Sequence, residues 1–476
     1  RKYISWKDID LSSLSIIMVT KLELSNPFNG EKFKELTYHS WQEVESLLIT
    51  AGNSQQEWKH TEISERIQLV KDAMDYFHKN QKTIADDITR QMGKPITQSM
   101  SEVTGMIHRS DVCCTLAEDA LKNITLTEAD GLRRFIKREP LGVILDIAAW
   151  NYPLLIAVNV VVPAVLAGNS VAIKHSSLTP LCGKAFEDAF KFAGAPDGLV
   201  TSLIMEHQTT EQVIQSGLIQ HLAFTGSVTG GRRVKTSVGS QFIETGLELG
   251  GKDPAYIRED ANVDKVIPAV MDGVFYNAGQ SCCAVERIYV HHTLFDTFLS
   301  RAIQYMNALN IGNPMEETTD LGPMAQLSGV ETAIAQINDA ETKGADVHYY
   351  SGNVPEGSHF LAPAILTNVN HQMDIMQEES FGPIVGIMPV QSDADAIKLM
   401  NDSPYGLTAS VWTKDAEKAI EIGNQIETGT FYMNRCDVLD PALPWVGVKD
   451  SGKGCTLSTL GIQEMTRPKA FNMKFD

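Results

Sequence analysis

The stretch "LGVILDIAAWNYPLLIAVNVVVPAVLAGNSVAIK", residues 141–174, contains two short runs of branched apolar residues separated by a longer apolar segment. The runs at 141–148 and 170–174 have the length and composition of buried strands. An asparagine and a proline interrupt the segment between them, 153–168, before it reaches the roughly 18 unbroken apolar residues of a membrane helix. This segment is therefore expected to form a buried helix.

Further strand-like runs occur at 219–226, 253–257 and 287–292, separated by segments of helical length. Strands that alternate with helices predict an α/β fold with parallel sheet. Residues 54–94 carry charged faces at helical spacing and predict two or three surface helices.

Two other segments alternate apolar and polar residues. Residues 120–140 alternate around an Asp-Gly turn and predict a β-hairpin, and the stretch "RPKAFNMKFD" at 467–476 predicts one more strand. Neither segment has an obvious core of its own, so both are expected to pair with another subunit, in a homodimer or homotetramer.

The composition is that of a full-sized globular protein. Apolar residues make up 43% of the 476 residues and charged residues 21%, which argues against a disordered chain. Forty Lys and Arg against 59 Asp and Glu give a net charge of −19. Such a charge repels phosphate backbones and anionic membrane surfaces, so neither nucleic acid nor membrane is an expected partner.

Cysteine usage indicates a reducing compartment. The seven cysteines are an odd number and form no CxxC or Cys/His cluster, so no metal site is expected. The opening 24 residues show no small-residue cleavage site, and a cytoplasmic location is expected. The first residue is not Met and Met18 is internal, so the true start of the chain stays open.

Three side chains offer a covalent chemistry. Cys282 and Cys283 are adjacent in "GQSCCAVER", and a thiolate attacks electrophilic carbon when a base is near or its pKa is lowered. Glu248, before a Gly-Gly turn, can take a proton from water, and the amide of Asn151, just after a strand, can donate to an oxyanion. Each residue alone has a structural explanation: a packed thiol, a solvated charge or a turn amide.

The ordered set of motifs resembles the aldehyde dehydrogenase superfamily from about residue 24 to 470. The motifs are "AWNYP", "FTGSVTGG", "ELGGKDP", "GQSCCAVER", "EESFGP", "NDSPYGL" and "PWVGVKDSGKG", all in the family's order. In that register Gly279, Gln280 and Arg287 select Cys282 as the nucleophile, while Cys283 is expected to pack as its neighbour.

The resemblance implies an NAD(P)-dependent oxidation of an aldehyde. The Cys282 thiolate adds to the carbonyl, the oxyanion is held by the Asn151 amide and the backbone N–H of Cys282, and hydride leaves for the nicotinamide. Water activated by Glu248 then hydrolyses the thioester to a carboxylic acid. Members that form acyl-CoA generally lack this Glu, so the hydrolytic branch is expected.

The resemblance also implies an α/β fold with a Rossmann-like dinucleotide-binding domain, an α/β catalytic domain and a small β oligomerisation element. The expected bounds are 24–121 and 141–250 for the first, 251–449 for the second, and 122–140 with 450–476 for the third, after an N-terminal extension at 1–23.

Residues for the cofactor and the substrate are carried over by position. The expected cofactor-binding residues are Trp150, Lys174, Ser177, Gly226, Ser227, Gly231, Glu379 and Phe381. The expected substrate-tunnel residues, besides Trp150 itself, are Tyr152, Leu155, Asn159, Leu439 and Trp445.

The cofactor choice rests on one departure from the common pattern. Many NAD-preferring members have Glu three residues after the lysine that matches Lys174, and this carboxylate repels a 2′-phosphate. This chain has Ser177 there, so NADP is expected to be accepted alongside NAD.

The substrate expectation rests on missing cations. Succinate-semialdehyde enzymes of the family carry Arg at the positions of Asn159 and Tyr276, so a carboxylate tail would lack a partner here and an uncharged aldehyde is favoured. Alternatives are a semialdehyde dehydrogenase, a catalytically idle structural member, or a Cys/His hydrolase that needs no dinucleotide.

Overall fold

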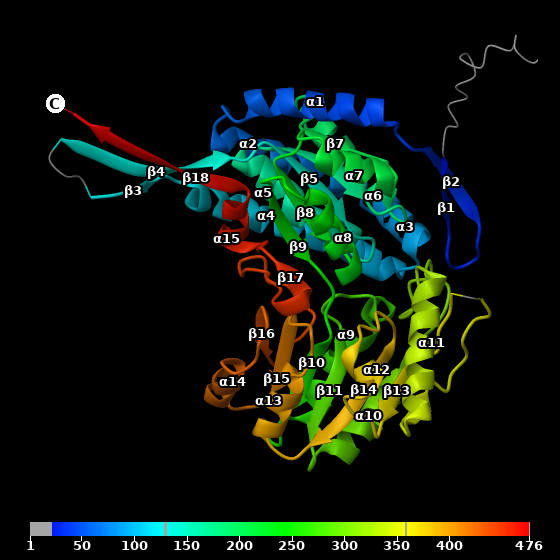
Figure 1. The fold of residues 1–476 in the computed structure, drawn as a ribbon. Helices are drawn as coiled ribbons and strands as arrows, with labels where there is room; N and C mark the ends of the chain where they lie inside the picture. The colour runs from blue at the N-terminus through cyan, green and yellow to red at the C-terminus, as the bar shows by residue number, and fades with distance from the viewer. Residues whose placement is uncertain (1–20, 128–130, 358, 476) are drawn as a thin grey trace, which may run out of the picture.

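The computed structural model describes residues 21–127, 131–357 and 359–475. Its elements form two large sheets, one above the other in Figure 1, with a narrow β-arm that extends from the side of the upper half. A two-stranded sheet of β1 (Lys21–Ser25) and β2 (Lys32–Thr37) begins the described chain.

The upper sheet has six strands in the order β17-β9-β8-β5-β6-β7. Its strands are β5 (Val143–Ala148), β6 (Ser170–His175), β7 (Val200–Ser202), β8 (His221–Thr225), β9 (Glu244–Glu248) and β17 (Gly452–Lys453). All neighbours are parallel except β17, which pairs antiparallel with β9.

The lower sheet has seven strands in the order β12-β13-β14-β11-β10-β15-β16. Its strands are β10 (Asp253–Ile257), β11 (Val285–His291), β12 (Asp346–Tyr349), β13 (Ala364–Thr367), β14 (Ile384–Val390), β15 (Thr408–Trp412) and β16 (Thr430–Met433). Only β12, at one edge, is antiparallel to its neighbour. The predicted α/β class with parallel sheet is confirmed.

Helices cover both sheets (Figure 1). Those before β10 are α1 (Trp41–Trp58), α2 (Ile63–Lys79), α3 (Gln81–Met92), α4 (Ile96–Leu121), α5 (Pro153–Ala167), α6 (Pro180–Phe192), α7 (His207–Gln215) and α8 (Val228–Val238). Those after it are α9 (Val263–Phe275), α10 (Phe295–Ala308), α11 (Leu327–Thr342), α12 (Asp374–Gln377), α13 (Asp393–Asn401), α14 (Ala416–Gly423) and α15 (Ser458–Glu464), with the short 3-10 turns η2 (Tyr276–Gly279) and η3 (Lys449–Ser451).

Alternate residues of β5 enter two hydrophobic cores, one on each face of the upper sheet. Ile144 and Ala148 pack with α2 to α6, while Val143, Leu145 and Ile147 pack with α1 and α7. A strand buried on both faces is mostly apolar, which explains why residues 141–148 and 170–174 were recognisable in the sequence despite the buried Asp146.

The expected buried helix is α5, in which all residues except Leu155 are buried. The charged segment 54–94 forms the end of α1 together with α2 and α3, in agreement with the predicted number of helices. These helices are not confined to the surface, because Val70, Phe77 and Ile88 are fully buried in the core beneath them.

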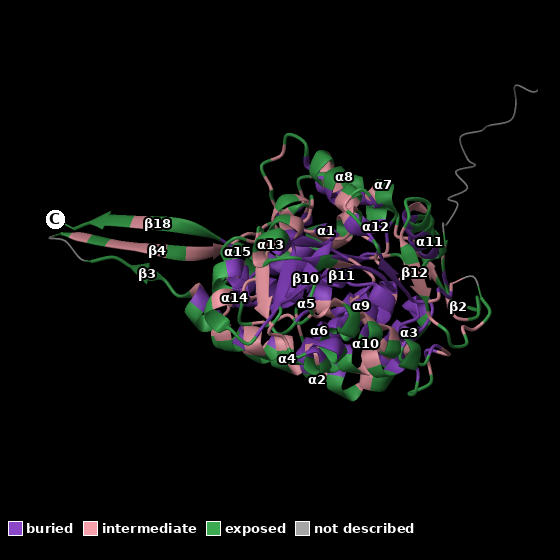
Figure 2. Ribbon diagram, turned by 90° about the horizontal axis from the view of Figure 1, so that it is seen from below, coloured by how far each residue is buried: buried purple, intermediate pink, exposed green. Residues whose placement is uncertain are grey.

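The β-arm consists of β3 (Ile124–Thr125), β4 (Leu132–Pro140) and β18 (Thr466–Lys474), in the order β18-β4-β3. The hairpin and the C-terminal strand, both expected to pair with another subunit, also pair with each other: β4 pairs with β18 of the same chain along its whole length. Figure 2 shows the arm standing clear of the body, with mostly exposed or half-buried residues. Part of the predicted Asp-Gly turn, and most of the proposed extension 1–23, lie outside the described residues.

Within the described ranges, no helix combines the length and the apolar character that crossing a membrane would require.

Candidate active site

Two cavities meet at Cys282, between the two sheets. The α4-side cavity, about 400 Å³, is lined by one face of α4, the start of α5, η2 and side chains of segment 436–445. The β6-side cavity, about 510 Å³, is lined by the carboxyl ends of β5, β6 and β8, by residues of α11 and by residues 379–381. Only Asn151, Thr225, Glu248 and Cys282 line both.

A tight turn presents Cys282. Asn277 and Ala278 have left-handed backbone angles (φ 52° and 55°), and Gly279 follows at φ 70°. A Cβ atom on Gly279 would lie 2.3 Å from the carbonyl oxygen of Gly382, so only glycine fits. The Gln280 side chain donates to Asn277 O (3.0 Å) and accepts from Ala325 N (3.0 Å), which fixes the turn from within.

Asn151 lies between β5 and α5 with its buried side chain against this turn. Its Nδ2 donates to Gln280 O at 3.1 Å, and Asn277 Nδ2 donates to Asn151 O at 3.1 Å. The amide is therefore held beside the Cys282 backbone, where it can donate to an oxygen bound near the thiol.

Glu248 ends β9 and faces both cavities. Its carboxylate accepts a hydrogen bond from the Thr456 hydroxyl and a longer one from Thr225 Oγ1, at 3.4 Å. Burial raises the pKa of Glu248, whereas the hydrogen bond from Thr456 and the charge of Arg109 act in the opposite direction. A carboxylate whose pKa is raised towards neutrality is a better proton acceptor for water than an ordinary one.

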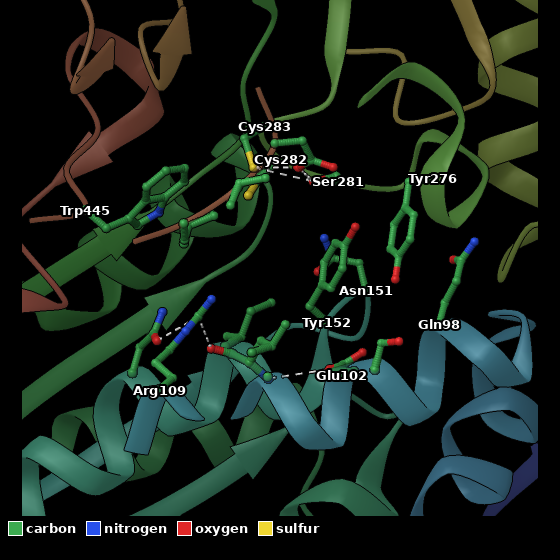
Figure 3. A pocket seen from close by; sticks show the side chains of 18 of the residues that line it. Gln98, Glu102, Arg109, Asn151, Tyr152, Tyr276, Ser281, Cys282, Cys283 and Trp445 are labelled. Atoms are coloured by element: carbon green, nitrogen blue, oxygen red, sulfur yellow. Dashed lines mark hydrogen bonds between the residues drawn. The ribbon is translucent and has the colours of Figure 1, made fainter. Parts of the chain in front are cut away.

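The two adjacent thiols differ in their surroundings. Cys282 is half-buried and reaches both cavities, whereas Cys283 is buried and donates to Asp437 Oδ1 at 3.0 Å, with Ser281 Oγ at 3.5 Å (Figure 3). A hydrogen bond with Cys282, together with burial, raises the pKa of the Cys283 thiol well above its ordinary value. Such a thiol stays protonated at neutral pH.

The β6-side cavity gathers most of the expected cofactor-binding residues: Trp150, Lys174, Gly226, Ser227, Glu379 and Phe381. Ser227 caps α8, its side chain accepting from Gly230 N, so the positive helix end faces the cavity. The Trp150 and Phe381 rings meet edge to face at 5.6 Å. An elongated cavity at the carboxyl ends of parallel strands, with a lysine and a helix N-terminus, fits a dinucleotide.

Two expected cofactor-binding residues do not line this cavity. Gly231 packs against Leu249, the residue after β9, where a Cβ atom would lie 2.6 Å from Leu249 Cδ2, so it serves the close packing of α8 on this segment. Ser177 is exposed and borders a separate small hollow, while its neighbour Ser176 lines the β6-side cavity.

A buried ion pair that the sequence did not reveal supports the 379–381 segment. Glu286 accepts from Lys252 Nζ (2.7 Å) and from the backbone N–H groups of Ser380 (2.7 Å) and Phe381 (2.9 Å). Gly251 N donates to Glu379 at 3.0 Å, and burial raises the pKa of Glu379 to about 8. This network fixes the backbone that carries Glu379 and Phe381.

All the expected tunnel residues line the α4-side cavity: Tyr152, Leu155, Asn159, Leu439 and Trp445. Trp150 lines only the β6-side cavity. Sequence reasoning missed the opposite wall, one face of α4 formed by Gln98, Ser101, Glu102, Gly105, His108 and Arg109 (Figure 3). Their spacing of three and four residues was a usable signal, because it places all six on one side of a helix.

A second buried pair secures this wall. Glu102 pairs with Lys94 and accepts from Leu154 N at 2.9 Å, at the first turn of α5. The Lys94 ammonium lies 4.0 Å from the centre of the Tyr152 ring. The pair thus links α4 to the turn that carries Asn151.

Arg109 gives the tunnel a positive charge that was not expected from the sequence. Its Nη1 donates to Leu155 O (2.8 Å) and to Asn159 Oδ1 (2.9 Å), so Asn159 orients a guanidinium. Burial lowers the pKa of Arg109 to about 10, and it remains a cation at neutral pH. The premise that a carboxylate tail would find no cation here is therefore wrong, because the cation comes from α4.

No cluster of three or more His, Cys, Asp or Glu suited to a metal ion occurs in the described part of the chain.

Comparison with known proteins shows which family the chain resembles. The profile of the family described as "Aldehyde dehydrogenase family" matches residues 18–471. The chain is 33% identical over 449 residues to an aldehyde dehydrogenase of Paenarthrobacter nicotinovorans, covering 93% of this chain and 98% of that protein. It is 33% identical over 445 residues to a succinate-semialdehyde dehydrogenase [NADP(+)] of Deinococcus radiodurans, covering 93% of each.

Among solved structures, the chain resembles the NADP-dependent glyceraldehyde-3-phosphate dehydrogenase of Bacillus halodurans C-125 in complex with NADP. The TM-score is 0.91 at 29% identity, covering 96% of each chain.

Proposed function

This chain belongs to the aldehyde dehydrogenase family and is an NAD(P)-dependent oxidoreductase, and from that premise we propose that it oxidises an aldehyde to its carboxylic acid through a thioester on Cys282. The observation that carries the proposal is the meeting of two cavities at Cys282, with Asn151 and Glu248 on their shared wall. One cavity would admit the aldehyde, and the other would hold the dinucleotide.

The residues divide the chemistry as follows. The Cys282 thiolate attacks the aldehyde carbon, and the Asn151 amide, with the backbone N–H of Cys282, stabilises the negative oxygen that forms. Lys174, Ser227 and Glu379 would hold the dinucleotide, which would accept a hydride from the tetrahedral carbon and so leave a thioester on Cys282. Glu248 then removes a proton from water, which attacks the thioester and releases the acid and the thiolate.

The proposed reaction assigns a role to each part of the chain. Residues 24–121 and 141–250 would bind the dinucleotide, residues 251–449 would supply Cys282 and its turn, and 122–140 with 450–476 would serve assembly. The last segment also supports the proposed active site, because its strand β17 pairs with β9, the strand that ends at Glu248.

The substrate has two candidates. Leu155, Leu439 and Trp445 provide apolar walls that suit an uncharged aldehyde, as the sequence alone favoured. A semialdehyde is the second candidate, favoured by the Arg109 guanidinium in the same cavity. It receives support from the relative named succinate-semialdehyde dehydrogenase.

An aldehyde panel crossed with NAD and NADP tests the function. We expect reduced nicotinamide to form at 340 nm, with one equivalent of carboxylic acid by NMR and no acceleration by coenzyme A. Failure of every aldehyde to reduce either cofactor, with the protein folded, would contradict the proposal. Release of acid from an ester, together with failure of every aldehyde to reduce either cofactor, would instead indicate a cysteine hydrolase.

Self-association through the β-arm is part of the proposal. Strand β18 pairs with β4 on one side only, and its other edge is free among the described strands, as is the case for short β3. Free strand edges invite pairing with a second copy. Sedimentation is expected to show a dimer or tetramer, and a stable monomer at micromolar concentration would contradict it.

A further inference from the structure

Arg109 is the cation of the α4-side cavity, and among the described residues no carboxylate lies within 4.0 Å of its guanidinium, although the charge of Glu248 acts on it from farther away. Resting on the proposed function, we propose that Arg109 binds a carboxylate at the far end of the substrate, so that the enzyme prefers short aldehydes carrying a terminal carboxylate. The argument depends on the donors of the guanidinium, on the other charges of the cavity, and on the position of Arg109 relative to Cys282.

The guanidinium is oriented but only partly used. Both of its hydrogen bonds, to Leu155 O and Asn159 Oδ1, come from Nη1. Among the residues that the structure describes, Nε and Nη2 have no hydrogen-bond partner, and no carboxylate lies within 4.0 Å of the group. The N–H groups of Nε and Nη2 are therefore free donors on Arg109, whose side chain lines the cavity.

A half-buried guanidinium without an anion is costly, because little water replaces the missing partner. Its planar fork matches the two oxygens of a carboxylate, and a bidentate pair offsets that cost. Arg109 is held by a backbone carbonyl and an amide oxygen, so a ligand would meet a group already oriented.

The acidic groups of the cavity have donors of their own. Glu102 is paired with Lys94, Asp437 accepts from Ser281 (2.9 Å) and Cys283, and Glu248 accepts from Thr456. Asp272 and His108, the other titratable lining residues besides the cysteines and tyrosines, are exposed. An anionic tail thus meets one cation that still has free donors.

Arg109 and Cys282 lie on different walls. In Figure 3 Arg109 extends from α4, while Cys282 lies across the cavity beside Cys283. An aldehyde carbon at Cys282 would therefore direct its tail past Tyr152 and Leu155 towards α4. A cavity of about 400 Å³ is sufficient for a short chain of this kind.

The test compares wild type, Arg109→Gln, Arg109→Lys and the control Arg301→Gln, a half-exposed arginine on α10 outside both cavities. Succinate semialdehyde and butanal serve as four-carbon probes with and without the carboxylate. We expect a wild-type preference for the semialdehyde in kcat/KM. We expect Arg109→Gln to reduce that preference about 100-fold, Arg109→Lys to restore part of it, and Arg301→Gln to leave it unchanged.

A binding measurement makes the test independent of turnover. Calorimetric titration of the enzyme with succinate and with butanoate should show tighter binding of succinate in wild type and loss of that difference in Arg109→Gln, with circular dichroism confirming the fold. Equal binding of the two acids by wild type overturns the proposal. An equal fall in activity on both aldehydes, with an alkaline shift of the pH profile, also overturns it, since Arg109 would then act through Glu248.

Different results would contradict the Arg109 proposal and the proposed function. If butanal is oxidised and the carboxylate has no effect, only the Arg109 proposal falls. If no aldehyde of the panel reduces a cofactor, the proposed function falls, and succinate binding still decides the role of Arg109.

Discussion

The two cavities that meet at Cys282 have walls of different kinds. The α4-side cavity is bounded largely by side chains, and its charged members Glu102 and Asp437 are tied to buried partners. The β6-side cavity is bounded by strand ends, the glycine-rich start of α8 and the backbone of residues 379–381, which Glu286 holds.

This difference predicts which of the two cavities a single substitution can alter more easily. A side-chain wall changes its charge and shape with one substitution, while the path of the chain is unaffected. A wall of backbone atoms changes only if the strand or turn moves. We therefore expect the substrate preference to respond to single mutations more strongly than the general ability to bind a dinucleotide.

The largest effect is expected at Cys282, one of the four residues that line both cavities. Cys282→Ala should lower the rate of cofactor reduction at least about 10³-fold, because no other group forms the thioester. Cys283→Ala, its matched control, should retain most of the activity, since that thiol faces Asp437. Calorimetry should show that both variants still bind NADP. Equal loss in two folded variants would contradict the assignment.

Glu248→Gln is expected to slow the steady state by about 10²–10³-fold, because an amide cannot take the proton from water. Hydride transfer precedes that step, so stopped-flow absorbance should show a stoichiometric burst of reduced cofactor followed by slow turnover. If the burst itself slows in proportion to the steady state, Glu248 acts in another step.

On the cofactor side, a new carboxylate should lower the NADP/NAD ratio of kcat/KM. Ser176 lines the β6-side cavity near Lys174, so Ser176→Glu should reduce the ratio about ten- to a hundredfold through repulsion of the 2′-phosphate. Ser177→Glu, at the exposed neighbouring position, should change it by about tenfold at most, owing to solvent screening. A larger effect at residue 177 would show that the ribose extends beyond the described cavity.

The smallest effect is a pH dependence of stability on the substrate side. Burial raises the pKa of Asp437 to about 7, so the folded protein keeps a proton that the unfolded chain has lost. This contribution is complete below about pH 4 and is lost as the pH rises through about 7.

Between pH 5 and 7 the unfolding free energy of wild type should therefore fall about 2 kcal/mol more than that of Asp437→Asn. Urea denaturation at several pH values measures this, with the exposed Asp75→Asn as a control. Parallel curves for wild type and Asp437→Asn would show that residue 437 does not titrate in this range.

The sequence predicted the features that depend on local pattern or family register. The strands at 141–148 and 170–174 were predicted because burial on both faces favours largely apolar runs, in which the buried Asp146 is an exception. The expected tunnel residues were carried over from matching positions in the family. The α4 wall was missed because polar residues three and four apart on a long helix resemble a solvated face. Lys252 and Glu286 are too far apart in the chain for their pairing to appear in any local pattern.

The misplaced residues have a similar cause. Gly231 was predicted from a glycine-rich turn, but the same residue type is required where a helix packs closely on a neighbouring segment, here against Leu249. Ser177 was placed by its offset from Lys174, yet the chain turns after Ser176, and the next side chain faces away from the cavity.

The strands β17 and β18 have a consequence for synthesis. The ribosome makes residues 452–474 long after the partners with which they pair, β9 and β4. Until then, the strand that ends at Glu248 has an open edge and the Thr456 hydroxyl is not available to Glu248. Asn169 Nδ2 also lacks one of its two acceptors, Met465 O. A nascent chain that already contains Cys282, Asn151 and Glu248 therefore cannot assemble the complete site before residues 452–474 are made. A ribosome that stops shortly before residue 452 releases a protein with every proposed catalytic residue but without the hydrogen bond from Thr456 to its base.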